Sequence, residues 1–268
     1  MKLKRTITDT FKPTINNYWN QLLTGGGLIK NNTSHLKIGF KSARAGTYTD
    51  AQLDDYTMFA RSKYPWKAPL RMTVKAKFDF FDKRQNKSNT FQGTAGFGFW
   101  NNPFSVTGAY YALPEAIWFF YTSSKSCMAF SQNDDYGWKA QVVHSLKLSN
   151  ILYFFPTAFA VLFARLTKNT RFASKWIKRF SGIEETSLEI AMDQWHEYKL
   201  EWKKNQAKFY VDDKMIMMTN NPPTRPLGFV LWVDNQYAVV TPTGKMQFAT
   251  ATSKALFLHI ASVKIESC

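Results

Sequence analysis

The sequence is poor in the residues that build metal centres, disulfide frameworks and nucleophilic catalytic sites. Its 268 residues include only two cysteines, Cys127 and Cys268, and four histidines, and none of them falls in a metal-ligand spacing. No Walker loop, nucleophile-elbow motif or Ser-His-Asp spacing occurs. We therefore predict no metal and no other cofactor.

The chain also lacks an apolar segment behind its basic first ten residues, which a cleaved secretion signal would require. Together with the scarcity of cysteine, this predicts a cytoplasmic protein. Acidic residues are few: 19 Asp and Glu stand against 35 Lys and Arg, a net charge of +16. Such a field favours an anionic partner, either nucleic acid, an anionic bilayer or another polyanion.

No acidic residue occurs between Tyr136 and Ile183, and this window contains the most lipophilic part of the chain, residues 151–164. The uncharged run from Leu148 to Ala164 has 17 residues, the lower limit for a helix that spans a bilayer. Pro156 in its middle would kink such a helix. We therefore expect contact with a membrane rather than a span across it.

Residues 171–180 have a different pattern, with an apolar stripe beside a basic flank. This pattern is typical of a helix that lies in the interface of an anionic membrane. The alternative is a helical hairpin packed on the sheet with its basic side in water. The predicted membrane-contact residues are Phe154, Phe155, Phe159, Phe163, Phe172, Lys175, Trp176, Lys178 and Arg179. Because no nucleic-acid module is visible and the apolar run lies inside the most basic region, we expect a bilayer and not nucleic acid.

Elsewhere the chain reads as short strands. Apolar and polar residues alternate over Arg71–Phe80 and again over Trp195–Trp202, so each has one face in a core and one in water. Ala116–Thr122 is continuously apolar and aromatic, and Asp212–Asp213 is the predicted turn of a hairpin. Many strands separated by turn signals predict an all-β sandwich or jelly roll.

The predicted domain organisation has three parts. Residues 1–30 form an N-terminal arm that ends at the three glycines 25–27. Residues 31–268 form a single jelly-roll domain of two antiparallel sheets. Within it, residues 145–190 form a basic and apolar helical insertion.

Three segments resemble family 16 glycoside hydrolases and related concanavalin A-like jelly rolls. Residues 195–214 are similar to that family's strand pair after the active site, W-H-x-Y-x-x-x-W followed by F-Y-V-D-G-K, with Asp213 in place of the glycine. Gly96–Trp100 resembles the strand before the family's catalytic strand, and Pro226–Asn235 resembles a following concave strand. The resemblance implies the concanavalin A-like fold and says little about activity.

The family's catalytic strand reads E-x-D-x-x-E, because retaining hydrolysis needs two carboxylates that flank the scissile bond. Residues 116–121 are the counterpart here, and they place Ala116, Trp118 and Tyr121 at the three acidic positions. Glu115 is adjacent, but alternation places it on the other face. We therefore predict that retaining glycosidase chemistry is absent. The segments from Gly93 and Ala116, together with D-N-Q-Y-A-V-V-T-P, are similar to a bacterial branch of the superfamily with a hydrophobic insert at the same place.

The resemblance implies a concave groove lined by aromatic side chains, which stack on sugars or enclose apolar ligands. The predicted ligand-binding residues are Trp100, Asn101, Trp118, Tyr121, Trp138, Trp232, Asn235 and Tyr237. The alternative is that half or more of these aromatics fill the core and that the polar residues form a turn. Asp234 is the leading candidate for a catalytic carboxylate, and His144 is the second candidate for acid–base chemistry.

Three hypotheses of function follow. The preferred one is a peripheral protein on the cytoplasmic face of a membrane that binds an amphipathic ligand, such as a glycolipid, isoprenoid or polyketide-like molecule. The second is an enzyme (cyclase, isomerase or hydrolase) that acts on such a substrate. The third is a divergent glycosidase or lectin for soluble glycans. The sequence predicts no oligomeric state.

Overall fold

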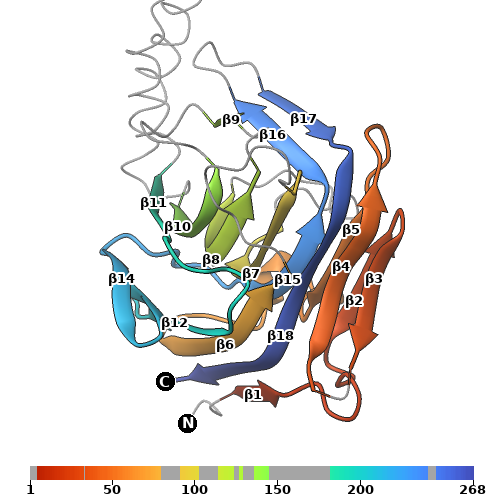
Figure 1. Cartoon of the computed structure of the whole chain (residues 1–268). Coiled ribbons are helices and arrows are strands. Elements are labelled where there is room, and N and C mark those ends of the chain that lie inside the picture. Colours follow the sequence, from red (N-terminus) through yellow and green to blue (C-terminus); the bar gives the residue numbers. More distant parts are fainter. Residues whose placement is uncertain are drawn as a thin grey trace, which may run out of the picture.

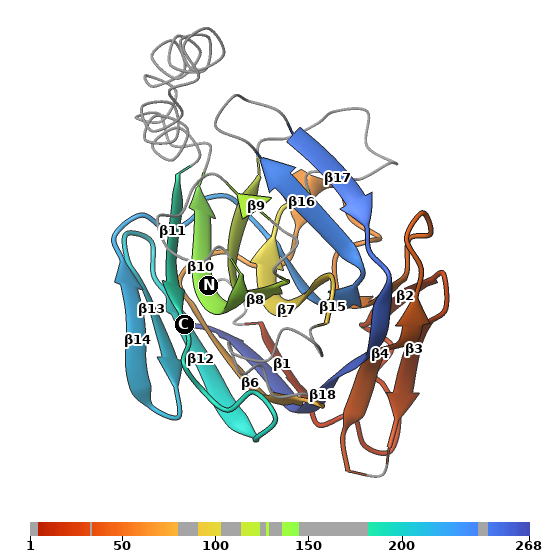
Figure 2. The same ribbon diagram turned by 45° about the horizontal axis from the view of Figure 1, so that its top comes forward.

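The computed structural model describes residues 5–32, 34–79, 91–102, 114–123, 127–128, 136–144, 182–240 and 246–268. These residues form two large antiparallel sheets packed face to face and a third, smaller sheet. Figures 1 and 2 show the layer with β7 and β8 above the layer with β6, β12 and β18. The predicted all-β jelly-roll sandwich is therefore confirmed.

The eight-stranded sheet runs from β14 at the left of Figure 1, through β12 and β6 low in the picture, to β4 and β3 at the right. Its path is β14 (Lys214–Thr219), β13 (Ala207–Val211), β12 (His196–Trp202), β6 (Leu70–Phe78), β18 (Ser253–Ser267), β4 (Leu36–Ala43) and β3 (Gly27–Asn31). The short β1 (Thr6–Asp9) also pairs with β18.

The seven-stranded sheet is the second layer. Its order is β11 (Ile183–Ser187), β10 (Gly137–His144), β8 (Glu115–Thr122), β7 (Thr94–Trp100), β15 (Gly228–Asp234), β5 (Asp50–Asp54) and β2 (Asn20–Thr24). The chain continues from β15 into the small sheet, which contains β17 (Met246–Thr250), β16 (Gln236–Val240) and β9 (Cys127–Met128).

The core lies between the two large sheets and is rich in aromatic rings. Phe119 of β8 lies 5.0 Å from Tyr198 and 5.4 Å from Phe209 of the other sheet, measured between ring centroids. The alternation predicted for β6 is present, since every second side chain from Leu70 to Phe78 is buried. Burial of these alternate apolar side chains stabilises both sheets at once.

The N-terminal segment differs from the prediction. Residues 6–31, which fall largely in the predicted arm, form β1, β2 and β3 and pair with three other strands. The chain crosses from one large sheet to the other between β2 and β3, where Gly25 and Gly26 have φ of 55° and 94°. A Cβ on Gly25 would lie 2.0 Å from the carbonyl oxygen of Tyr48, so only glycine fits this crossing.

The predicted helical insertion at 145–190 is not supported by the structure. Residues 183–187 form strand β11, which pairs with β10, so the predicted range extends too far. Residues 145–181, including all nine predicted membrane-contact residues, lie outside the described residues. In the part of the chain that is described, one 3-10 turn, Arg61–Lys63, is the only helical element, and no helix could cross a membrane.

Candidate functional site

The candidate site is the face of the seven-stranded sheet that points away from the core, called the outer face below. Strand β8 shows how the two faces divide. Ile117 and Phe119 are buried in the core between the sheets, whereas Trp118 and Phe120 pack in a separate cluster. Side chains alternate between faces along a strand, so Ala116, Trp118 and Phe120 share the outer face.

Four aromatic side chains meet on this outer face and are called the aromatic cluster: Trp100, Trp118, Phe120 and Trp232. Trp118 is stacked with Phe120, with ring centroids 5.3 Å apart and planes at 13°. Its centroid is 5.0 Å from that of Trp232 and 6.0 Å from that of Trp100. Tyr56 and Tyr64 pack against the same cluster. The result is an apolar platform built from β7, β8 and β15.

Two glycines of β7 make room for these indoles. Gly96 and Gly98 lie opposite Trp232 and Trp118 in the sheet register. A Cβ at position 96 would come 2.9 Å from the Trp232 ring, and one at position 98 would come 2.5 Å from Cβ of Trp118. The alternation of glycine with Phe97 and Phe99 therefore leaves space on the outer face while filling the core.

Each indole N–H of the cluster has a hydrogen-bond acceptor. Trp118 donates to Gln141 Oε1 at 2.8 Å, and Trp232 donates to Thr94 Oγ1 at 2.9 Å. Trp100 donates to the Tyr56 hydroxyl at 2.7 Å. These bonds hold the rings in place, so a ligand would meet fixed aromatic surfaces rather than unsatisfied donors.

Polar groups border the platform on the β10–β11 side. Glu185 Oε2 accepts a hydrogen bond from Gln141 Nε2 at 2.8 Å and forms an ion pair with Lys139 Nζ at 3.2 Å. These side-chain contacts form a series that runs from Lys139 through Glu185 and Gln141 to the indole of Trp118. This border is a hydrogen-bonding edge beside the apolar platform.

A second polar border comes from β5 and the turn that follows it. The Asp54 carboxylate accepts hydrogen bonds from the Gln52 amide at 2.8 Å, from the Thr57 hydroxyl at 2.7 Å and from the Thr57 backbone N–H at 2.9 Å. Gln52 lies directly opposite Trp232 in the register. The aromatic cluster therefore lies between two hydrogen-bonded networks.

Asp234 and Asp50 face each other at one end of this surface, on β15 and β5. Asp234 accepts hydrogen bonds from the Thr94 hydroxyl at 2.8 Å and from the backbone N–H of Thr94 and Gln236. Burial outweighs these bonds and raises the pKa of Asp234 to about 7. Burial, followed by the charges of Asp234 and Asp54, raises the pKa of Asp50 well above its usual value. Neither Asp50 oxygen has a hydrogen-bond partner among the described residues.

The strand that corresponds to the catalytic strand carries no carboxylate on the outer face. It keeps a regular register with both neighbours, so its three outward positions are Ala116, Trp118 and Phe120. The prediction placed Tyr121 at the third position, but Tyr121 points into the core. Glu115 is on the inward side, as its parity predicts, and lies opposite His144.

His144 does not belong to the candidate site on the outer face. Its Nε2 atom lies 3.3 Å from Glu115 Oε1, and both side chains are buried at the sheet end. Burial raises the pKa of Glu115 to about 7. Because His144 has the inward parity of Ala140 and Val142, the structure does not bring it to the aromatic cluster.

The other predicted site residues fall into two groups. Trp100, Trp118, Trp232 and Asp234 lie on the outer face, whereas Trp138 is in the core, 5.2 Å from Phe78 between ring centroids.

The remaining predicted ligand-binding residues, Asn235, Asn101 and Tyr237, are not part of the aromatic cluster. Asn235 donates to three backbone carbonyl oxygens and accepts from the backbone N–H of Thr49, so it organises a turn. Asn101 accepts from the backbone N–H of Glu115 at 3.1 Å. Tyr237 is half-buried on β16 in the small sheet.

The sequence reasoning missed Phe120, Tyr56, Gln141 and Asp50. Alternation from Trp118 would have found Phe120, but Gln141 and Asp50 join the site through strand pairing and Tyr56 through the turn after β5, which no local pattern reveals. In the described part of the chain, no group of three His, Cys, Asp or Glu side chains is arranged to hold a metal ion.

Comparison with known proteins supports the fold. The family described as glycosyl hydrolases family 16 matches residues 177–242. Curated proteins include no match. The solved structure of a Crh5 transglycosylase in complex with NAG has a TM-score of 0.52 at 10% identity, covering 98% of this chain and 84% of the other.

Two further structures show the same fold. Endo-β-1,3-glucanase from Pyrococcus furiosus has a TM-score of 0.51 at 11% identity, covering 98% of this chain and 94% of its own. The exoplasmic/lumenal domain of VIP36, in its Ca²⁺/Man3GlcNAc-bound form, has a TM-score of 0.51 at 12% identity, with 96% and 86% covered. The predicted resemblance to glucanase-like and lectin-like jelly rolls is thus confirmed.

Proposed function

We propose that this protein binds an amphipathic ligand, with a hydroxyl-rich part and an apolar part, on the outer face of the seven-stranded sheet. The observation that carries the proposal is the content of β8, where Ala116, Trp118 and Phe120 stand at the positions that would need carboxylates. Retaining hydrolysis requires two carboxyl groups about 5–5.5 Å apart across the bond, and this strand supplies neither. The proposed activity is binding without that chemistry.

The arrangement of the face suits such a ligand. A stacked platform around Trp118 offers apolar contact, and the borders at Glu185 and Asp54 offer acceptors for hydroxyl groups. Solved relatives in fold include a transglycosylase in complex with NAG and a domain with bound Man3GlcNAc. A glycolipid combines both chemistries, and an isoprenoid or polyketide-like molecule would use mainly the platform.

Binding is tested with a short alkyl glycoside, below its micelle concentration, against the same sugar without the alkyl chain. We expect the alkyl glycoside to bind more tightly and Trp118→Ala to weaken it about tenfold, the value of one lost aromatic contact. Tyr210→Ala, on the other sheet, is the matched control and should change nothing. Equal binding by both single variants, measured calorimetrically, would contradict the proposal.

Membrane association is a separate part of the proposal, and it rests on the charge of +16 and on the acid-free sequence window. We propose that the protein lies on the cytoplasmic face of an anionic membrane. Flotation with anionic liposomes compares the full chain with a chain that lacks residues 147–180. The full chain should float and the shortened chain should not, and equal partitioning of the two would reject this part.

The Asp50–Asp234 pair favours a second candidate, an enzyme that uses Asp234 as a proton donor or acceptor for the same ligand. A carboxyl group with a pKa near 7 exchanges protons readily at neutral pH. Asp234→Asn should then abolish turnover of the substrate extracted with the protein while binding persists. Unchanged turnover in that variant would remove the assignment. A third possibility is a divergent glycosidase or lectin, for which we expect binding of soluble glycans but no sugar release from β-glucans.

A further inference from the structure

Strand pairing aligns four basic side chains in one row across the eight-stranded sheet. Lys30 of β3 lies opposite Lys37 of β4, Lys37 lies opposite His259 of β18, and His259 lies opposite Lys77 of β6. The alternate residues of these strands fill the core, so this basic row is on the outer face of the sheet. Adjacent strands are about 4.8 Å apart, so the row spans about 15 Å.

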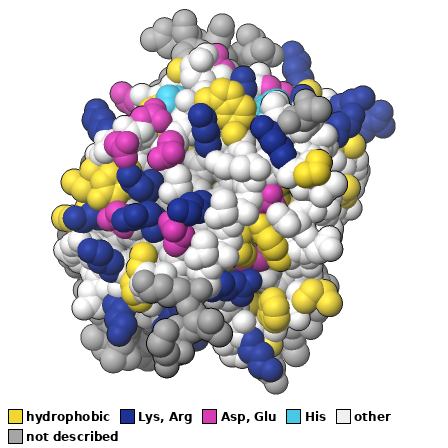
Figure 3. All heavy atoms as spheres, turned by 90° about the horizontal axis from the view of Figure 1, so that it is seen from below, with side chains coloured by type: hydrophobic (Ala, Val, Ile, Leu, Met, Phe, Trp, Pro, Cys, Tyr) yellow, Lys and Arg dark blue, Asp and Glu magenta, His cyan; other side chains and the backbone are white. Residues whose placement is uncertain are grey.

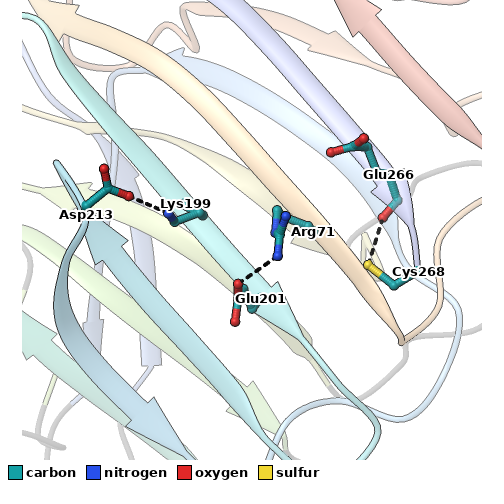
Figure 4. A network of polar contacts seen from close by, with 6 residues as sticks. All are labelled: Arg71, Lys199, Glu201, Asp213, Glu266 and Cys268. Atoms are coloured by element: carbon teal, nitrogen blue, oxygen red, sulfur yellow. Dashed lines mark hydrogen bonds and ion pairs between the residues drawn. The ribbon is translucent and has the colours of Figure 1, made fainter.

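The basic row contains no acidic side chain, although like charges directly opposite on neighbouring strands are unfavourable. Elsewhere on the same face several basic residues form ion pairs, as Figure 4 shows for Arg71 with Glu201 and for Lys199 with Asp213. Among the described residues, Lys37 and Lys77 take part in no ion pair. This stretch of the face therefore keeps its positive charge uncancelled.

Asp79, a carboxylate that feels the charges of Lys37 and Lys77, is already engaged. Asp79 Oδ1 accepts the backbone N–H of Phe257 at 3.0 Å. Burial raises the pKa of Asp79, while Lys37 and Lys77 act in the opposite direction without forming an ion pair. Glu197, on the other side, lies opposite Lys75 in the register and not opposite the basic row.

Aromatic rings, rather than carboxylates, contact Lys37 and Lys77, the two lysines on either side of His259. Lys37 Nζ lies 4.0 Å from the centroid of the Phe257 ring, and Lys77 Nζ lies 5.5 Å from that of Trp195. A cation–π contact positions an ammonium group but leaves its charge and its N–H donors available. Figure 3 views this face and shows, near its top, a yellow hydrophobic side chain between dark-blue basic ones, with cyan histidines close by.

A histidine pair completes the cluster. His259 Nδ1 and His35 Nε2 are 2.8 Å apart, and His35 Nδ1 is 2.8 Å from the Ser34 hydroxyl. Burial, then His35, Lys37 and Lys77, lowers the pKa of His259 to about 4. Burial, followed by Lys77, Lys37 and Lys12, also lowers the pKa of His35. Burial and the surrounding positive charge therefore both oppose protonation of these two histidines.

We propose that the basic row is a binding site for an anionic group of the phosphate type, centred on His259 between Lys37 and Lys77. The anion would cancel the charge that the sheet concentrates there and would accept hydrogen bonds from ammonium donors. This anion site and the proposed ligand platform are on opposite sheets, so the failure of one proposal would not affect the other.

The test titrates the full-length protein with inorganic phosphate and follows its four histidines by NMR. Binding should move the titration of His259 upward, because a bound anion offsets the repulsion between the protonated imidazole and the neighbouring lysines. Lys37→Gln/Lys77→Gln should bind phosphate at least about tenfold more weakly, and Lys37→Arg/Lys77→Arg should restore binding. If the lysines had a purely structural role, added phosphate would not move the His259 titration.

The matched control is Lys199→Gln/Lys264→Gln, which removes two charges from the same face but leaves the basic row intact. We expect at most about a twofold loss of affinity, the effect of net charge alone. An equal loss in both double variants would overturn the proposal.

Vesicles separate the two sources of a phosphate group. One set contains phosphatidylcholine alone and the other adds phosphatidic acid. If phosphate binds but flotation does not depend on Lys37 and Lys77, the site is assigned to a soluble phosphorylated compound. If flotation depends on these lysines but free phosphate does not bind, the site is assigned to a lipid headgroup. Absence of both effects would overturn the proposal.

Discussion

The outer faces of the two large sheets have the same backbone geometry and opposite chemistry. The face of the seven-stranded sheet carries Trp118, Phe120 and Trp232 above two glycines, and its polar groups bond to one another. The face of the eight-stranded sheet carries lysines, histidines and acids in rows set by the register. The contrast teaches that every second residue of a strand decides what its sheet can bind, while the other residues build the shared core.

The largest expected effect concerns how the unfolding free energy depends on pH, and it compares one aspartate from each large sheet. Asp234 keeps its proton to about pH 7 in the folded chain, but an unfolded aspartate loses it near pH 4. Its contribution to stability is therefore present below pH 4 and is lost as pH rises to about 7, up to about 4 kcal/mol. Asp234→Asn should flatten the fall in unfolding free energy across that range, measured by urea denaturation at several pH values.

Asp212, on the other sheet, gives the contrasting control. Burial opposes the shift, but the hydrogen bond to His196 lowers the pKa of Asp212, so its contribution is present at neutral pH and lost in acid. Asp212→Asn should change the pH dependence of stability in the opposite direction from Asp234→Asn. The same direction for both variants would break the comparison.

A second prediction concerns the glycines beneath the indoles. Gly98→Ala should lower the unfolding free energy by about 3 kcal/mol, because Gly98 has φ of 149° and a Cβ would meet Trp118 at 2.5 Å. Urea denaturation measures the loss. Thr73→Ala, on β6 of the other sheet, is the control and should cost less than about 0.5 kcal/mol. A mild effect at Gly98 would mean that the aromatic platform tolerates displacement.

The smallest expected effect is the ion pair between Arg71 and Glu201, which lie opposite each other on β6 and β12 at 3.1 Å. Their side chains are partly exposed, so a double-mutant cycle with Arg71→Ala and Glu201→Ala should give a coupling of about 0.5 kcal/mol or less. Added salt should reduce it further. A coupling well above 1 kcal/mol would show that this face is less solvated than the comparison assumes.

The strands with one face in the core and one face in water were predictable from the local alternation of apolar and polar residues. Alternation identified β6 and β12, and the predicted hairpin turn at Asp212 and Asp213 is present, with φ of 47° and 63°. Strand β8 was predicted as a strand, but its parity was misassigned at Tyr121. Both of its faces are buried, so an apolar run carries no signal of which side chains point inward.

Three short strands that no local pattern revealed are held in place by pairing with other strands. Strands β2 and β3 were expected in an arm, and β11 was expected inside the insertion, because each is short and polar enough to read as a loop. β2 pairs with β5 and β11 pairs with β10, each across a long stretch of chain, whereas β3 pairs with the next strand, β4. Pairing free energy that depends on a distant strand leaves no periodic trace in the segment itself.

The sequence by itself determined the fold class, the resemblance to glucanase-like jelly rolls and the absence of carboxylates at the outward positions of β8, because these follow from residue types at short, regular spacing. Only the tertiary structure decided that Asp50 faces Asp234, that Trp138 belongs to the core, and that Lys37, His259 and Lys77 share one row. Each of these juxtapositions is created by register between strands distant in the chain, and a shift of one residue would undo it.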